Sequence, residues 1–315
     1  MNGLPVPYPD ELWYSIVARR LRDWGYVNRS AELLQVYGSK PPVINMAAPL
    51  RPGRFFSHEG GENLPPTRIL AARHTLLPYY LAFASPAKRQ SALDVIDGPD
   101  VLAKLRLGAV TRKLVPTYLR FCKDCLEIDK LLVGESYWHR SHQVPGLHRC
   151  PEHGGVLFES SVSYQPERLD YWTAHSTRCR ATPASRVSEC MGRVLAKAVG
   201  QVLLSVLAVG EMVDLWIDKR RYATLLTDCG YGAARGRVAT TAIEEGFRAF
   251  LHRHQAEPTA FGPAGWWLAA FTRVPGALTP LQHLLLREFI RHRLIRSGRA
   301  PVPNDVIAAH AHLAS

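Results

Sequence analysis

Two short pairs of metal-ligand residues constrain the fold of this chain more than any other feature of its sequence. Cys122-x2-Cys125 is followed, after 24 residues, by Cys150-x2-His153. Each pair can supply two ligands to one tetrahedral ion, and two such knuckles cross-link a small module. The spacing therefore predicts one Cys3His zinc site, with a short strand before each knuckle. Because four protein ligands fill a tetrahedral sphere and leave no position for water, the predicted zinc is structural.

The other histidines of the same stretch leave an alternative open. His148 lies two residues before Cys150 and could replace His153 as a ligand, although C-x2-H makes the better knuckle. His139 and His142 are interpreted as packing or surface residues.

A second metal site is a weaker interpretation. His175, Cys179 and Cys190 have spacings that could supply part of a zinc site, but no fourth ligand is evident. The simpler interpretation is one or two small buried cysteines, and Cys229 at a helix end is expected in the core.

The motifs that would indicate catalysis are absent from the sequence. We find no H-E-x-x-H, no H-x-E followed by P-C-x-x-C, no phosphate-binding loop and no nucleophile elbow. Carboxylates are scattered without the spacing of a metal-dependent nuclease. The sequence therefore predicts a protein that is not an enzyme.

The charge favours an anionic partner. The formal net charge is +12, and residues 216–299 hold thirteen Lys and Arg against six Asp and Glu. Such a basic segment is typical of DNA-binding proteins. The N-terminus does not resemble a secretory signal, and the longest apolar run, 199–210, is too short to cross a bilayer. We expect a cytoplasmic protein with reduced cysteines and no membrane partner.

The expected fold is mainly α, with a small β-containing zinc-knuckle module between two helical regions. The expected domains are an N-terminal helical region at 1–118, the zinc-binding module at 119–160 and a C-terminal helical region at 161–315. Asp10 and Ser30 are expected to cap two short N-terminal helices, and Thr279 to cap a last amphipathic helix.

A helix–turn–helix-like unit is predicted in the basic half of the chain. One helix should end at Gly230, and the next should begin near Thr240 after a glycine- and arginine-rich turn. The alternative is a solvated surface turn. The predicted DNA contacts, mostly to phosphates, are Lys219, Arg220, Arg221, Arg235, Arg237, Thr240 and Thr241.

Three stretches together resemble one known family, the TnsD/TniQ target-selection proteins of bacterial transposons. They are LPVPYPDELWYSIVARR (4–20), HTLLPYYLAF (74–83) and, most strongly, RFCKDCLEIDKLLVGESYWHRSHQVPGLHRCPEHGGVLF (120–158). The later YATLLTDCGYGAARGRV is similar to the TnsD-type continuation into a helix–turn–helix region. Family members are often longer, so the resemblance implies either a short member or a part of one.

The resemblance implies an adaptor rather than a transposase. TnsD proteins bind a specific attachment site in double-stranded DNA and recruit a AAA+ ATPase regulator (TnsC-like), which brings in the transposase. TniQ relatives instead link an RNA-guided CRISPR effector complex to the ATPase. A stand-alone zinc-containing transcription regulator remains an alternative of another class. The segment that opens the family motif is expected to dock on the ATPase through an exposed stretch, with core packing as the alternative; its residues are Tyr8, Glu11, Trp13 and Tyr14.

Overall fold

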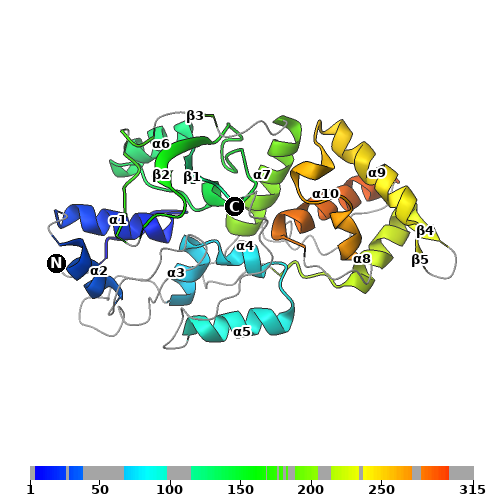
Figure 1. Ribbon diagram of the computed structural model, residues 1–315, viewed down its shortest axis with the longest axis horizontal. Coiled ribbons are helices and arrows are strands. Elements are labelled where there is room, and N and C mark those ends of the chain that lie inside the picture. The colour runs from blue at the N-terminus through cyan, green and yellow to red at the C-terminus, as the bar shows by residue number, and fades with distance from the viewer. Residues whose placement is uncertain are drawn as a thin grey trace.

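A computed structural model describes residues 4–25, 28–37, 67–97, 115–167, 169–175, 177–179, 182–183, 189–204, 214–233, 237–271 and 278–297. In these ranges the molecule is mainly helical, as expected, and it has two small sheets (Figure 1). The N-terminal helices and the larger sheet lie toward one end of its long axis, and α8, α9 and α10 lie toward the other. Among the described helices, none is long and apolar enough to cross a membrane.

The N-terminal part consists of short helices, and two of the expected caps are wrong. The helices are α1 (Trp13–Asp23), α2 (Arg29–Tyr37), α3 (Thr67–His74), α4 (Leu77–Leu81) and α5 (Pro86–Asp97). Leu12 is the N-cap residue of α1, without a side-chain hydrogen bond. Asp10 has a φ of 54° and instead binds Arg140. Before α2 it is Asn28, not Ser30, whose side chain accepts a hydrogen bond from the amide of Ala31.

A three-stranded antiparallel sheet lies next to the cysteine-rich stretch. Its strand order is β1 (Tyr118–Phe121), β2 (Phe158–Ser163), β3 (Thr182–Pro183). Strand β1 runs directly into α6 (Lys123–Val133), and a single 3-10 turn follows at Ser141–Gln143. The expected strand before the first knuckle is therefore present. Before the second knuckle, the structure has an isolated bridge between Arg149 and Val156.

In its described residues, the C-terminal part contains four α-helices and a pair of short antiparallel strands. The helices are α7 (Glu189–Leu204), α8 (Lys219–Leu226), α9 (Thr240–Arg253) and α10 (Pro280–Arg296), with 3-10 turns at Pro258–Ala260 and Trp266–Ala270. Between α8 and α9 the chain forms a π turn (Thr227–Tyr231) and the strands β4 (Gly232–Ala233) and β5 (Arg237–Val238). Gly230 ends the helical run with a φ of 88°, and α9 begins at Thr240, as expected.

The cysteine-rich stretch contributes to both large hydrophobic cores. One core joins α1 and α2 to β1 and β2, with Phe121 and Trp138 among its members. The other joins α4 to α7, α8, α9 and α10, and it includes Cys122, Cys125 and Cys150. The stretch therefore packs against both helical parts instead of forming a separate body.

Candidate metal centre

The first knuckle is positioned by the junction of β1 and α6. Cys122 is the N-cap residue of α6, and Cys125 lies in the first turn of that helix. Three residues along a helix correspond to nearly one turn, so the two sulfurs lie on the same side of α6. Both cysteines are buried.

The second knuckle is a tight turn closed by backbone hydrogen bonds. The amide of Cys150 donates to the carbonyl of Gly155, and the amide of Gly154 donates to the carbonyl of Cys150, both at 2.8 Å. Gly154 has a φ of +68°, a left-handed conformation that glycine adopts without strain. The turn brings Nδ1 of His153 to 3.7 Å from the sulfur of Cys150.

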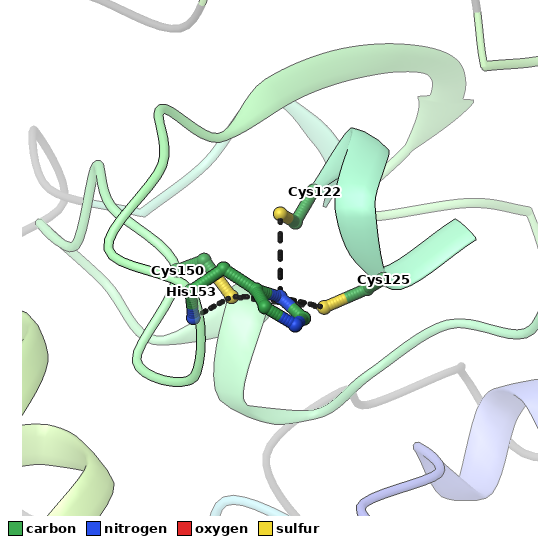
Figure 2. Close-up of side chains that lie close together, drawn as sticks. All are labelled: Cys122, Cys125, Cys150 and His153. Carbon is green, nitrogen blue, oxygen red and sulfur yellow. Dashed lines mark hydrogen bonds between the residues drawn. The ribbon is translucent and has the colours of Figure 1, made fainter. Parts of the chain in front are cut away.

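The four predicted ligands come together in one cluster (Figure 2). The ligand atoms of Cys122, Cys125, Cys150 and His153 all lie within 4.8 Å of one another. His153 Nδ1 is 3.9 Å from the sulfur of Cys122, 3.2 Å from that of Cys125 and 3.7 Å from that of Cys150. The sulfurs of Cys125 and Cys150 are 3.7 Å apart.

These distances fit a tetrahedral ion. With Zn–S and Zn–N bonds of about 2.3 and 2.0 Å, a tetrahedron has S–S edges of about 3.8 Å and S–N edges of about 3.6 Å. The edges formed by Cys125, Cys150 and His153 are within about half an ångström of these values. The three cysteines are buried and His153 is exposed, so the cluster is reached from the His153 side.

The electrostatics of the cluster also favour a cation. The thiols of Cys125 and Cys150 donate hydrogen bonds to the sulfur of Cys122, and these bonds lower the pKa of Cys122. The same hydrogen bond to Cys122 favours the protonated thiol of Cys125 and raises its pKa. Without a cation, close sulfurs hold a proton between them because adjacent thiolates repel one another. A divalent ion would replace that proton and allow all three thiolates to form.

The two knuckles are joined by buried polar contacts that do not involve the ligands. Gln143 pairs with the backbone of Arg120 in β1, accepting from its amide at 2.9 Å and donating to its carbonyl at 2.8 Å. The guanidinium of Arg120 is buried and donates to the carbonyls of Val144 and Leu147. These contacts hold β1, which leads to Cys122, against the loop that leads to Cys150.

A second buried network ties the same loop to the rest of the molecule. Arg140 donates to Asp10, to the carbonyls of Ala72 and Thr75, and to the carbonyl of Leu203 in α7. Burial disfavours the charged form of Asp10, but hydrogen bonding to His139 and the charge of Arg140 hold its pKa well below the usual value.

His139 lies between two carboxylates. Its ring nitrogens are 3.7 Å from Asp10 and 3.0 Å from Asp129. Burial opposes the charged imidazole, yet hydrogen bonds to Asp10 and Asp129 raise the pKa of His139 to about 9. The sequence analysis interpreted His139 only as a packing or surface residue and assigned no role to Arg140 or Gln143, because the distant carboxylates and carbonyls that they bind cannot be located from spacing.

The residues expected to meet a protein partner are largely buried. Glu11, Trp13 and Tyr14 are almost inaccessible, and Tyr8 is only half-buried. Glu11 binds Arg19 at 2.8 Å, and burial raises the pKa of Glu11 to about 6 despite that partner. The expectation of an exposed stretch is wrong for Glu11, Trp13 and Tyr14, because Glu11 binds the Tyr8 amide and Arg19 while Trp13 and Tyr14 pack into a hydrophobic core. Their role toward a partner stays a prediction.

Most residues expected to contact DNA are at the surface. Lys219, Arg220 and Arg221 form the exposed first turn of α8, Arg237 is exposed in β5, and Thr240 and Thr241 are exposed at the start of α9. Arg235 lies outside the described residues. DNA contact by these residues stays a prediction.

The weaker second cluster does not assemble in the described part of the chain. Cys190 is exposed and lies 3.0 Å from His254 of α9, whereas His175 bonds to Thr177. No metal-ligand group containing His175, Cys179 and Cys190 is found among the described residues. Cys229 is buried, as expected.

The sheet, the buried N-terminal segment and the Cys3His cluster form one continuous unit, and that unit has a known counterpart. Residues 4–157 match the TniQ family model, a match that contains all four predicted ligands. This match and the relative described next support a TnsD/TniQ family protein. It is 31% identical over 180 residues to the Tn7 transposition protein TnsD of Escherichia coli; the aligned region covers 56% of this chain and 35% of that protein. The chain thus matches about a third of the length of this relative.

Proposed function

We propose that this protein selects the target site of a transposon. It binds a specific attachment-site DNA and recruits the AAA+ ATPase regulator (TnsC-like), which in turn brings in the transposase. The observation that carries the proposal is the TniQ match over residues 4–157, together with the similarity to TnsD. Such a protein acts in the cytoplasm, associated with the nucleoid.

The metal centre serves this function as a structural zinc site. Cys122, Cys125, Cys150 and His153 would hold the ion, and four protein ligands leave no open position for a substrate or a reactive water. In this role zinc supplies folding free energy rather than chemistry, so the protein is an adaptor and not an enzyme. Cys125→Ser should lose bound zinc and unfold the module; a full zinc content in that variant, by metal analysis, would contradict the ligand set.

DNA binding is assigned to the unit formed by α8, the β4–β5 hairpin and α9. This unit takes the place of the helix–turn–helix expected from the sequence. The exposed cations at the start of α8 and Arg237 in β5 supply positive charge. Thr240 and Thr241 sit at the exposed N-terminus of α9, where backbone amides and hydroxyls favour phosphate oxygens.

Two other exposed arginines form ion pairs within their own helices. Arg248 of α9 pairs with Glu244 at 2.9 Å, and Arg291 of α10 pairs with Glu288 at 2.6 Å. A phosphate-contacting arginine contributes about one unit to the salt slope of binding. Arg237→Ala should therefore reduce the slope of log K against log salt by about one, and the matched control Arg248→Ala should leave it nearly unchanged. Equal slopes for the wild type and Arg237→Ala would contradict the assignment.

The contact with the ATPase is assigned to an apolar ridge on α6 next to the N-terminal segment. Leu131 and Leu132 are 85% and 78% exposed, and Ile128 is 39% exposed. Lone exposed apolar residues are ordinary, but neighbouring ones on one helix mark an interaction surface. We call these three residues the α6 ridge.

The buried N-terminal motif supports the α6 ridge. Arg19 of α1 donates to the carbonyl of Val6 at 3.2 Å and to Glu135, just past the end of α6, at 3.0 Å. The hydroxyl of Tyr8 also binds Glu135. One guanidinium therefore holds the end of α6 beside the exposed Val6, which is continuous with the segment expected to dock on the ATPase.

Disrupting the α6 ridge tests the ATPase contact. Leu131→Asp/Leu132→Asp should abolish co-purification with the ATPase in the presence of ATP and leave DNA affinity unchanged. Leu34→Asp, on the exposed side of α2, is the matched control because Leu34 is 50% exposed. If the ridge variant recruits the ATPase like the control, the contact lies elsewhere.

A gel-shift experiment tests the function as a whole. The protein is titrated against candidate attachment-site DNA and scrambled DNA, with and without the ATPase and ATP. A sequence-specific shift that the ATPase supershifts is the expected result. ATPase capture without a specific shift would support a TniQ-type adaptor of an RNA-guided CRISPR effector complex. A specific shift that the ATPase never changes would support a stand-alone transcription regulator.

A further inference from the structure

A third histidine lies against the metal cluster without belonging to the four-ligand set. His142 sits in the 3-10 turn at Ser141–Gln143 and is 1% exposed. Its Nε2 is 3.5 Å from the sulfur of Cys125 and 3.4 Å from the sulfur of Cys150. With Cys125 and His139 it forms a second group of side chains close enough together to hold a metal ion, and Cys125 belongs to both groups.

The ring of His142 is fixed on its other side. It stacks on His139 with ring centroids 4.8 Å apart and an angle of 30° between the planes. His139 is in turn held between Asp10 and Asp129, and it stacks on Tyr137. The neighbouring Gln143 anchors the same turn to β1. The position of Nε2 next to the two sulfurs is therefore enforced by the fold.

The chemistry of metal-bound sulfur determines whether His142 Nε2 donates or accepts in its contact with Cys125 and Cys150. A thiolate bound to a metal has lone pairs and no proton, so it can only accept a hydrogen bond. A nitrogen held at this distance is favourable only if it carries the hydrogen. Three thiolates and one neutral imidazole around a divalent ion have a net charge of −1 in a buried site, which a hydrogen-bond donor disperses.

We propose that His142 Nε2–H is a shared hydrogen-bond donor to the thiolates of Cys125 and Cys150. His142 is thus a positioning residue of the metal centre and not a ligand. Through the stack with His139, it also links the metal centre to Asp10 in the N-terminal segment. This inference rests on the proposed metal centre.

The test uses the full chain loaded with Co²⁺, whose spectrum reports both the ligand number and the sulfur electronics. His142→Phe removes the donor and keeps a planar ring, and His142→Gln keeps an N–H donor. His148→Phe is the control, because His148 is a partly buried histidine beside the second knuckle whose Nδ1 has no hydrogen-bond partner among the described residues. His153→Ala removes a proposed ligand. Co²⁺ and Zn²⁺ affinities are measured by competition with a chelator.

His142→Phe should keep the four-coordinate ligand-field bands and lose affinity by about 10–100-fold, the usual effect of removing an outer-shell partner. Its sulfur-to-cobalt charge-transfer band should move to lower energy, because an undispersed thiolate gives up electrons more readily. His142→Gln should keep the band near the wild-type position, and His148→Phe should match the wild type in both measurements. His153→Ala should change the ligand-field bands.

Three results would overturn the proposal. The first is a charge-transfer band and affinity of His142→Phe equal to those of His148→Phe, which would leave only packing. The second is loss of a ligand in His142→Phe with an unchanged spectrum in His153→Ala, which would make His142 the fourth ligand. The third result applies if His142→Phe does not fold. It is a sulfur-to-cobalt charge-transfer band of His142→Gln that moves to lower energy than in the wild type. Failure of the wild type to bind Co²⁺ or Zn²⁺ would instead refute the metal centre itself.

Discussion

Arg140 is the residue at which four segments of the molecule meet. Its guanidinium is 3% exposed and donates to Asp10, to the turn between α3 and α4, and to the carbonyl of Leu203 in α7. Only the planar fork of arginine can serve several acceptors in fixed directions.

Arg140→Met should therefore destabilise the protein by about 3–5 kcal/mol, since it removes one of the two cationic partners of the buried Asp10 carboxylate and leaves the buried carbonyls of Thr75 and Leu203 without their donor. The measurement is urea unfolding at fixed zinc concentration. The matched control is Arg291→Met, an exposed arginine paired with Glu288, which should cost less than about 1 kcal/mol. Equal costs for the two variants would contradict the role of Arg140.

His139 should make stability depend on pH. Its pKa is raised to about 9 in the folded protein, against about 6.5 when unfolded. The stabilisation is therefore fully present below pH 6.5 and is lost as the pH rises through 9, by up to about 3 kcal/mol.

His139→Gln should flatten the unfolding free energy between pH 6.5 and 9, whereas a change at the exposed His175 should leave the slope intact. The profile is measured by urea unfolding of the zinc-loaded protein at each pH. A wild-type profile that is already flat in this range would refute the prediction.

At the residue scale, the sequence predicted the four metal ligands but not the buried residues that hold them in place. The spacing of Cys122, Cys125, Cys150 and His153 predicted the cluster because chelating pairs have a fixed local geometry. The buried positions of His142 and Arg120 depend on long-range packing, which spacing does not encode. For the same reason, Glu11 and Trp13 looked exposed in the sequence and are buried in the structure.

At the scale of the elements, the packing of the π turn Thr227–Tyr231 against α9 depends on one glycine. A Cβ added to Gly246 of α9 would lie 1.9 Å from the hydroxyl of Tyr231 and 2.9 Å from its ring carbon. Tyr231 is buried, its hydroxyl has no partner in the described structure, and its ring packs 5.8 Å from that of Phe289 in α10. The ring therefore has little room to retreat.

Gly246→Ala should destabilise the protein by about 1–2 kcal/mol, because overpacking outweighs the gain in helix propensity. Tyr231→Phe removes the closest atom, so the same change should cost less in that background. The four free energies of unfolding form a double-mutant cycle. Additive effects would show that the two residues do not collide.

Helices that carry a capping motif and an apolar face in their own sequence were predicted best. Thr279 and Gln282 form a capping box at the start of α10, and Leu281, Leu285 and Phe289 are buried on its inner face. The β4–β5 hairpin was missed because strands of two residues give no alternating pattern. Asp10 does not cap α1 because its carboxylate instead accepts a hydrogen bond from Arg140, which is distant in the sequence.

At the scale of the whole molecule, the metal centre lies where the two large cores meet. Cys122, Cys125 and Cys150 belong to the core that contains α7, while Phe121 and Trp138 of the same stretch belong to the core that contains α1. Zinc binding contributes directly to the folding free energy of the segments it connects. The proposed zinc would therefore brace the part that contains α1 against the part that contains α7.

Hydrogen exchange of the zinc-loaded and chelated protein, read by mass spectrometry, tests this brace directly. Removal of zinc should reduce amide protection in the module and also in α1 and α7, while α10, which is far from the cluster in sequence and capped on its own, keeps most of its protection. Loss of protection confined to residues 122–153, or no loss at all, would contradict the account.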